Sequence, residues 1–233
     1  ETIFYYREVS RDDEPSIPFD EKILWLDDDL IVVDKPHFLP VTPSGRFLRE
    51  TLLTRLRLRP DLQHLDVANI TPLHRLDKDT AGVMLFSHNP ATRAAYHTLF
   101  PSHAIQKTYH ALAPTRLDLA YPLTVRTRLV PSEPFFLMRE TAGEANAETR
   151  ITLLEPRGAA SLYELQPITG KKHQLRVQMM GLGMPLLNDA LYPVVQPENA
   201  VDYAKPLQLL AKRLTFIDTI TGVERVFESE QEL

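Results

Sequence analysis

Residues 70 to 87 constrain the fold of this chain most, because a polar cluster there leads directly into a short apolar run. The apolar run, Val83 to Phe86, is bounded by Gly82 on one side and by the polar residues 87 to 90 on the other. A run of this length with such boundaries favours a buried strand over a helix. The polar residues before it, His74 to Thr80, are therefore predicted to form a loop at the mouth of a sheet, where reactive groups are often placed.

The spacing in this loop has a second, structural interpretation. Asp and Gly are ordinary turn formers, so Asp77 fits a turn or capping residue with Arg75 as its partner. The residue pattern alone leaves both interpretations open.

Composition excludes several classes of protein. The chain has 233 residues, 43% of them hydrophobic, which is enough for a substantial core without covalent crosslinks. It contains no cysteine, which excludes disulfides, thiolate metal sites and a cysteine nucleophile and is compatible with a reducing compartment; we expect a cytoplasmic protein. No apolar stretch approaches the ~20 residues of a membrane span, so no membrane association is expected.

Charge is distributed unevenly along the chain. The formal net charge is −5, but residues 1 to 29 carry −7 and residues 218 to 233 carry −4, which leaves +6 for residues 30 to 217. Because local basic surface steers nucleic acids, the central segment is compatible with a polyanionic partner despite the overall charge.

The N-terminal segment is predicted to be an acidic extended arm, residues 1 to 22, followed by one domain over residues 23 to 233. Residues 8 to 20 are polar and acidic and include Pro15 and Pro18. Asp27 to Asp29 then separates two apolar runs, which predicts a hairpin. Three adjacent carboxylates also suggest a cation site, but oxygen-ligand loops space their ligands more regularly, so we favour a solvated turn.

Five arginines surround the next predicted helix, where Leu52, Leu53 and Leu56 share one face and Pro60 ends the segment. Such a cluster fits either a solvated helix face or a surface that contacts phosphates. The five are Arg46, Arg49, Arg55, Arg57 and Arg59.

The remaining segments predict a mixture of strands and helices. Short helices are expected over residues 91 to 100 and 171 to 180, a loop over 184 to 206, and strands over 105 to 113, 147 to 154, 161 to 166, 207 to 210, 214 to 217 and 222 to 227. The predicted fold class is α+β, with a single domain on a long, mainly antiparallel mixed sheet flanked by helices and loops around a central cleft.

The polar loop and three other stretches together resemble the RluA/RsuA type of pseudouridine synthases. The first stretch is His74-Arg75-Leu76-Asp77-x-x-Thr80-x-Gly82, in which Ala81 replaces the Ser that the family usually has. The others, in the family's order, are Asp28 to Pro36, Lys107-x-Tyr109-x-Ala111 and Pro167 to Val177, and a weaker match covers Leu210 to Phe216. In the loop that follows Pro167 to Val177, Asn188 and Pro193 depart from the family pattern.

The resemblance implies an isomerase that converts uridine in rRNA or tRNA to pseudouridine without a cofactor. Asp77 would be the catalytic carboxylate, acting at C1′, at C6 or by assisting loss of the C2′ proton, all of which fit. Tyr109 would stack on the target base or transfer a proton. Arg176 would pair with Asp77, because a guanidinium favours the ionised carboxylate and holds its orientation.

Other residues are candidates for RNA contacts. Arg75 is expected to enter the stack vacated by the extruded uridine, because the target atom is unreachable while the base is stacked. Leu175 and Leu210 are candidates for the floor of the uracil pocket, although lone leucines normally belong to the core. His74, Lys107, Lys171, Lys172 and His173 complete the expected binding set; two histidines without a third ligand do not make a metal site, so no metal is predicted.

Two other functions compete with this prediction. One is an RNA-binding protein that kept the fold and lost catalysis; the presence of Asp77, Tyr109 and Arg176 argues against it. The other is a hydrolytic glycosidase or nucleosidase, which normally needs a second carboxylate, and Asp79 is the only close candidate. We expect an enzyme that works as a monomer on RNA.

Overall fold

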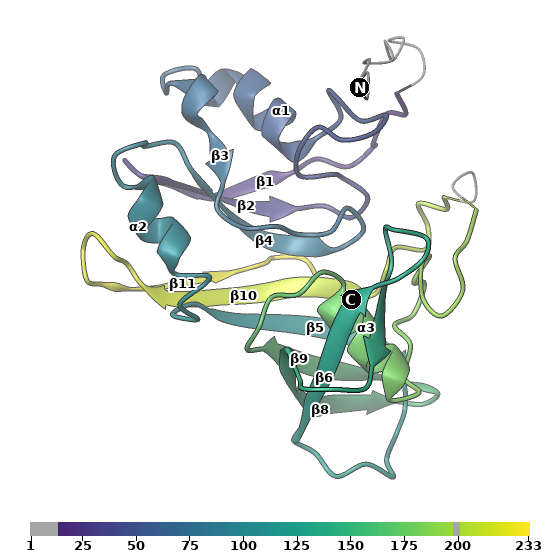
Figure 1. The fold of residues 1–233 in the computed structure, drawn as a ribbon. Helices are drawn as coiled ribbons and strands as arrows, with labels where there is room; N and C mark the ends of the chain where they lie inside the picture. The colour runs from purple at the N-terminus through teal and green to yellow at the C-terminus, as the bar shows by residue number, and fades with distance from the viewer. Residues whose placement is uncertain (1–13, 198–200) are drawn as a thin grey trace, which may run out of the picture.

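The computed structural model describes residues 14–197 and 201–233, and most of the predicted N-terminal arm, residues 1–13, lies outside them. The described residues form an eleven-stranded sheet with a few short helices (Figure 1). The strands are β1 (Lys22–Leu26), β2 (Leu30–Lys35), β3 (Thr71–Pro72), β4 (Ala81–Ser87), β5 (Gln106–Pro114), β6 (Leu123–Pro131), β7 (Met138–Thr141), β8 (Ala147–Arg157), β9 (Ala160–Pro167), β10 (Leu209–Ile217) and β11 (Glu224–Glu228). The helices are α1 (Leu52–Leu58), α2 (Arg93–Thr98) and α3 (Gln174–Gly181), with 3-10 turns at Pro60–Leu62 and Val67–Asn69.

The strand order is β1-β2-β4-β10-β5-β9-β8-β6-β7, with β3 beside β4 and β11 beside β10. Only the pair β4–β10 is parallel; the other pairs are antiparallel. The predicted α+β class and the long, mainly antiparallel sheet are therefore confirmed. The helices are few and short, so strand pairing dominates the fold.

The strands that carry the polar loop are covered on both faces. Every residue of β2 and of β4 is buried, which explains why Leu30 to Val33 and Val83 to Phe86 are continuous apolar runs and not alternating ones. Strand β9 instead alternates between fully and partly buried positions, as expected where one face packs on the core. The prediction that residues 83 to 86 form a buried strand is confirmed.

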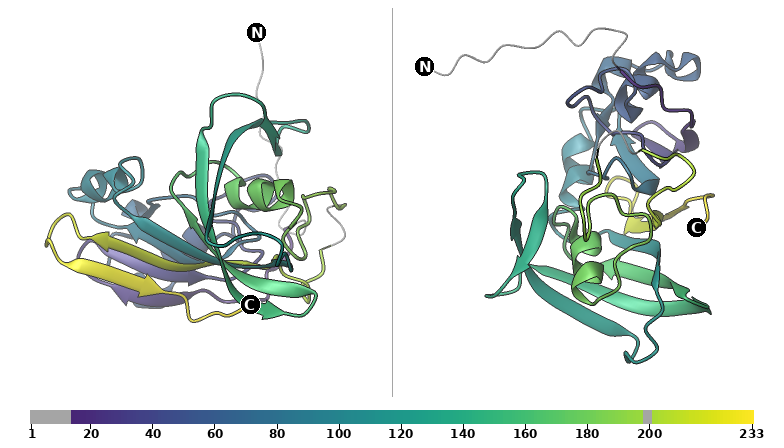
Figure 2. Two further views of the ribbon diagram at one scale, coloured as in Figure 1. Left: turned by 90° about the horizontal axis from the view of Figure 1, so that it is seen from below. Right: turned by 90° about the vertical axis from the view of Figure 1, so that its right-hand side faces the viewer.

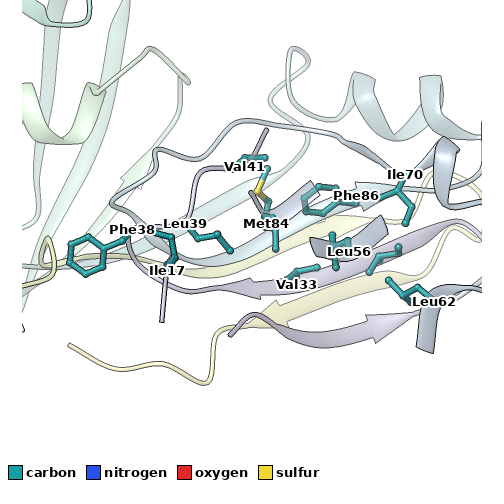
Figure 3. Packing of buried hydrophobic residues seen from close by; sticks show 12 residues of the cluster. Ile17, Val33, Phe38, Leu39, Val41, Leu56, Leu62, Ile70, Met84 and Phe86 are labelled. Atoms are coloured by element: carbon teal, nitrogen blue, oxygen red, sulfur yellow. The ribbon is translucent and has the colours of Figure 1, made fainter. Parts of the chain in front are cut away.

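Hydrophobic clusters lie in both halves of the sheet. In the first half, α1 packs Leu52 and Leu56 against Val33, Met84 and other residues of β2 and β4 (Figure 3). In the second half, α3 covers β5, β8 and β9 through Leu175 and Met179. Figure 2 shows the hairpin of β6 and β7 rising on the same side of the sheet as α3. Strand β10 lies between the two halves and pairs with both.

Gly82 permits the close approach of β4 to β10. Its φ is +112°, and a Cβ atom at this position would lie 2.2 Å from the backbone oxygen of Ala211. Because that oxygen belongs to a paired strand, no side chain fits here. The residue that ends the polar motif is thus fixed by backbone packing.

Several sequence predictions differ from the structure in their boundaries. The helix predicted from residue 171 begins at Gln174, because His173 adopts a left-handed conformation (φ +53°). The two strands predicted over 207–210 and 214–217 form one strand, β10, with an irregular register between Ala211 and Arg213. Strands β6 and β7 were not predicted. None of the helices in the described part of the chain is long and apolar enough to cross a membrane.

The beginning of the described chain packs against the domain. Ile17 is buried in the cluster of β2 and β4, and the Glu14 carboxylate accepts hydrogen bonds from the backbone N–H groups of Leu48, Arg49 and Glu50. Ordered structure therefore begins before β1, and the predicted boundary at residue 22 stays a prediction.

Candidate active site

Three adjacent strands bring the polar loop and Tyr109 together. Ala211 of β10 pairs with Gly82 of β4 on one side and with Tyr109 of β5 on the other. Because Gly82 directly follows the polar loop, this register places the loop beside Tyr109 at the centre of the sheet. The site is thus positioned by backbone pairing.

Asp77 begins a tight turn in which each backbone carbonyl accepts a hydrogen bond. The Thr80 N–H donates to the Asp77 oxygen at 3.1 Å, the Lys35 Nζ donates to the Lys78 oxygen at 2.9 Å, and the His37 Nδ1 donates to the Asp79 oxygen at 2.7 Å. Because these bonds hold the backbone, the Asp77 side chain is not needed to stabilise the turn. Residues 77 to 80 form a loop, as predicted, and its backbone is held by hydrogen bonds.

Lys35 is fully buried at the end of β2. Burial lowers the pKa of its amine to about 7, and the charges of Asp79 and Asp77 oppose this shift. Its Nζ donates to the carbonyl oxygens of Pro36, Leu39 and Lys78, each at 2.9 Å. Three acceptors match the three N–H groups of an ammonium, so the geometry is built for the cationic form.

The Asp77 carboxylate faces two groups of the segment around α3. Its Oδ2 lies 3.6 Å from Nη1 of Arg176 and 3.8 Å from Nε2 of His173, distances that are too long for hydrogen bonds. The side chain is 21% exposed. Within the described ranges, no group donates a hydrogen bond to this carboxylate, so its oxygens are available to a substrate.

Arg176 is held by a different carboxylate. Its side chain is 2% exposed, and its Nε and Nη2 donate to Asp189 at 2.8 and 2.5 Å in a bidentate pair. Burial alone would lower the pKa of Arg176, but the Asp189 hydrogen bonds and the charges of Asp189 and Asp77 raise it above its ordinary value. Arg176 is therefore a permanent cation of fixed orientation.

His173 is neutral at pH 7, and its Nε2 faces Asp77. Burial lowers its pKa to about 4, although Asp77 opposes the shift. The Tyr192 hydroxyl accepts from the Met138 N–H at 2.9 Å and lies 2.8 Å from Nδ1 of His173. With Nδ1 bound to Tyr192, the other ring nitrogen, Nε2, is the one that faces Asp77.

Tyr109 is half-buried on β5 beside this group. Burial and the Asp77 charge raise the pKa of its hydroxyl above the ordinary value. The phenol therefore stays protonated at neutral pH, with a ring that can stack and an O–H that can donate.

The structure separates the other predicted loop residues by environment. Arg75 is exposed and has no hydrogen-bond or ion-pair partner in the described part of the chain. His74 instead accepts a hydrogen bond from the Leu85 N–H at Nε2 and stacks on Phe100, with its pKa lowered by burial to about 4. The Arg75 side chain is thus accessible to a ligand, whereas the His74 ring makes its contacts within the fold.

Lys107 and Leu210 also make internal contacts. The Lys107 Nζ donates to the Thr169 oxygen and so ties β5 to the segment before α3. Leu210 is fully buried between Ala81 and His110. Among the remaining candidates, Leu175 belongs to the core beneath α3, while Lys171 is exposed and Lys172 half-buried beside His173.

The arginines near α1 are mostly structural. Arg55 donates to the backbone oxygens of Phe19 and Ile17 and pairs with Glu50. Arg57 binds the oxygens of Ala68 and Ile70, and Arg59 pairs with Asp61 and Glu21. Neither the solvated-face nor the phosphate-contact interpretation fits these three side chains. Arg46 and Arg49 remain exposed.

Sequence reasoning gave no role to Asp189, Lys35 or His37. A lysine that ends a fully buried strand was a usable signal for Lys35, because a buried ammonium needs hydrogen-bond partners. His37 had no local signal, because its partner Asp79 is distant in sequence. Asp189 lies between Asn188 and Pro193 in a segment that partly matches the family pattern, but that match gave it no role. No metal-binding group of three or more His, Cys, Asp or Glu side chains occurs in residues 14–197 and 201–233.

Comparisons with known proteins identify the relatives of this chain. A family model described as RNA pseudouridylate synthase matches residues 29–180. Pseudouridylate synthase RPUSD2 of Homo sapiens is 31% identical over 196 residues, which cover 81% of this chain and 34% of the human protein. Ribosomal large subunit pseudouridine synthase C of Vibrio cholerae is 30% identical over 171 residues, covering 73% of this chain and 52% of the bacterial protein.

The chain therefore spans about a third to a half of these relatives. The solved structure of human RNA pseudouridylate synthase domain containing 1 superposes with a TM-score of 0.71 at 22% identity, covering 93% of this chain and 86% of the human one, which shows a shared fold. The matched residues 29–180 include Asp77, Tyr109 and Arg176. The chain belongs to the RNA pseudouridylate synthase family.

Proposed function

We propose that this protein converts specific uridines in structured RNA, in rRNA or tRNA, to pseudouridine, with Asp77 as the catalytic carboxylate. One observation carries the proposal: an accessible carboxylate without hydrogen bonds in the described chain faces a buried, permanently charged Arg176. Such a carboxylate stays ready to act on a glycosidic bond.

The reaction needs no redox change and no energy input. The C1′–N1 bond of the uridine breaks, the uracil rotates, and a C1′–C5 bond forms, while C5 loses a proton and N1 gains one. Asp77 supplies the anionic oxygen at the sugar or ring. Tyr109, whose raised pKa keeps it protonated, offers a face for the base and a hydroxyl within a shielded site.

RNA binding is assigned to the exposed basic residues around this centre. We propose that Arg75, whose side chain is free in the described chain, enters the stack left by the extruded uridine. Lys171 and Lys172, just before α3, would contact phosphates. Asp77, Tyr109, Arg176 and Asp189 all come from one chain, which supports action as a monomer.

Asp189 does not supply the second carboxylate that a hydrolase would use. Its side chain has no exposed surface, and both oxygens accept hydrogen bonds from Arg176. A general acid must reach the leaving group, which this residue cannot do in its present position.

The product of the reaction tests the proposal. The protein should be incubated with unmodified rRNA and tRNA transcripts, and the RNA analysed for pseudouridine by chemical mapping and for free uracil by chromatography. We expect a mass-silent conversion of uridine with no uracil release. Uracil release without pseudouridine would indicate a hydrolase, and RNA binding with neither product would indicate a silent binding protein.

A further inference from the structure

A cavity opens beside the Asp77 turn, outside the group of Asp77, Tyr109 and Arg176. It measures about 210 Å³, and its lining includes Phe38, Phe47, Tyr203, Arg46 and Lys78. This is below the roughly 300–1,000 Å³ of sites for drug-sized ligands, so it suits one ring system. Lys78, which lines the cavity, directly follows Asp77 in the chain. The cavity therefore borders the Asp77 turn.

Aromatic rings and cations occur together in this cavity. Phe38 and Tyr203 meet edge to face with ring centroids 5.1 Å apart, and Phe38 lies at the end of the first core cluster (Figure 3). Arg46 Cζ and Lys78 Nζ lie 5.3 and 5.8 Å from the centroid of the Phe47 ring. Arg46 is exposed, and Lys78 is 38% exposed. Flat apolar walls with a cationic rim match a nucleobase that carries a phosphate.

Phe38 holds an unusual backbone conformation at this wall. Its φ is +67°, which is costly for a bulky residue without a local polar side chain. The neighbouring Pro36 and Leu39 carbonyls are both held by Lys35, so the same lysine fixes the backbone on each side of Phe38 and the Asp77 turn. The wall of the cavity and the catalytic turn thus form one rigid unit.

We propose that this cavity binds an unstacked base next to the target uridine, with Phe47 stacking on the base and Arg46 and Lys78 contacting the backbone phosphates. The inference rests on the proposed function and extends it to the recognition of a flanking nucleotide. Lys78 directly follows Asp77 in the chain, so a base bound in the cavity belongs to the part of the strand beside the target uridine. Stacking tolerates any base, so the site anchors the strand without reading its sequence.

Binding of a fluorescein-labelled ten-nucleotide oligouridylate, measured by anisotropy, tests the inference without relying on turnover. Phe47→Leu keeps apolar bulk but removes the flat ring, and should weaken binding about tenfold. Phe47→Trp should bind at least as tightly as the wild type. Trp25→Leu changes an exposed aromatic residue of the edge strand β1 and serves as the matched control, with no expected effect.

A ligand of the same length that lacks bases separates stacking from charge. The wild type should bind this abasic strand more weakly than oligouridylate, and Phe47→Leu should bind it as the wild type does. Equal affinity of Phe47→Leu and wild type for oligouridylate, or no binding by the wild type, would overturn the inference.

Arg46→Gln tests the phosphate contact without removing the Phe47 ring, because Arg46 is exposed and the ring stays in place. It should reduce the salt dependence of binding by about one phosphate contact. Its control is Arg150→Gln: Thr149 contacts Gln174 and Gln178 of α3, so the next residue of strand β8 points to the opposite face. An unchanged salt slope for Arg46→Gln would remove the phosphate contact from the proposal.

The pseudouridine assay keeps this inference distinct from the proposed function. Ring-dependent binding without any pseudouridine would support the cavity and reject the proposed reaction. Pseudouridine formation with binding that ignores the Phe47 ring would support the reaction and reject the cavity.

Discussion

Asp77 and Arg176 face each other across the site but are held in opposite ways. The Asp77 turn is fixed through its backbone: three carbonyl oxygens accept hydrogen bonds, and the side chain accepts none within the described chain. Arg176 is fixed through its side chain, which is buried and bound bidentately to Asp189. The turn therefore presents a carboxylate without hydrogen bonds in the described chain, whereas α3 supplies a cation whose orientation is fixed by Asp189.

Because of this difference, substitutions of Asp77 and of Arg176 should affect the stability of the fold differently. Removing the Asp77 charge leaves the backbone contacts of the turn intact, so the fold should tolerate it. Removing Arg176 leaves the buried Asp189 carboxylate without its partner, so the fold should not. The following substitutions test this contrast.

Arg176→Met should have the largest effect on stability. An uncompensated buried carboxylate should lower the free energy of unfolding by about 3–5 kcal/mol, measured by urea denaturation. Adding Asp189→Leu to the same protein should restore much of this loss, because no buried charge remains. A double variant as unstable as Arg176→Met would contradict the pairing.

Acidification should destabilise the α3 side of the site. The pKa of His173 is about 4 in the fold and about 6.5 in an unfolded chain, so the unfolded state binds its proton first as pH falls. Stability is full above pH 6.5 and declines toward pH 4, by on the order of 2–3 kcal/mol for this group.

His173→Gln should flatten that decline, as measured by unfolding at several pH values. His74, whose pKa is also about 4, contributes to a residual slope, as do His37 and His110, whose pKa values burial also lowers. The exposed His64→Gln is the control for the loss of a histidine outside the site. A His173→Gln profile identical to that of the wild type would contradict the neutral, buried histidine.

Lys35→Met tests the backbone support of the Asp77 turn. Three carbonyl oxygens lose their donor, which should lower the free energy of unfolding by about 1–3 kcal/mol. Because the turn loses only one of its three supports, amide exchange should accelerate around residues 77 to 80 more than in β4. Uniform acceleration would show that Lys35 supports the fold in general.

Arg75→Ala should have the smallest effect and leave stability unchanged. If Arg75 occupies the gap left by the extruded uridine, the single-turnover rate should fall about tenfold on a stem-loop and little on an unpaired strand, where less stacking is broken. Equal fractional losses on both RNAs would instead assign Arg75 to phosphate contact.

The sequence predicted the elements that have local patterns. These include the apolar runs of β2 and β4 and the leucines on one face of α1. Burial on both faces of a strand, or along one face of a helix, requires apolar residues at neighbouring or regularly spaced positions, which the sequence shows directly. Strands β6 and β7 escaped prediction: β6 mixes exposed charged residues with few buried ones, and β7 is short and carries Arg139 and Glu140.

Site residues that belong to a sequence motif could be predicted. Contacts between residues that are distant in sequence could not. Asp77 and Arg176 were expected to pair, and they do face each other. The stronger bond of Arg176 to Asp189 depends on how the loop after α3 folds back, which no local pattern encodes. Likewise, the arginines near α1 had the composition of a phosphate surface, but the carbonyls that three of them bind belong to segments up to 38 residues away.

The most direct test of the account is the single-turnover rate of Asp77→Asn on an RNA that the wild type modifies. Asp79→Asn is the matched control, because its side chain lies two residues on and is 20% exposed, close to the 21% of Asp77. We expect Asp77→Asn to lose at least about a thousandfold in rate with unchanged RNA affinity and unfolding free energy, and Asp79→Asn to remain active. Substantial pseudouridine formation by pure Asp77→Asn protein would contradict the central claim.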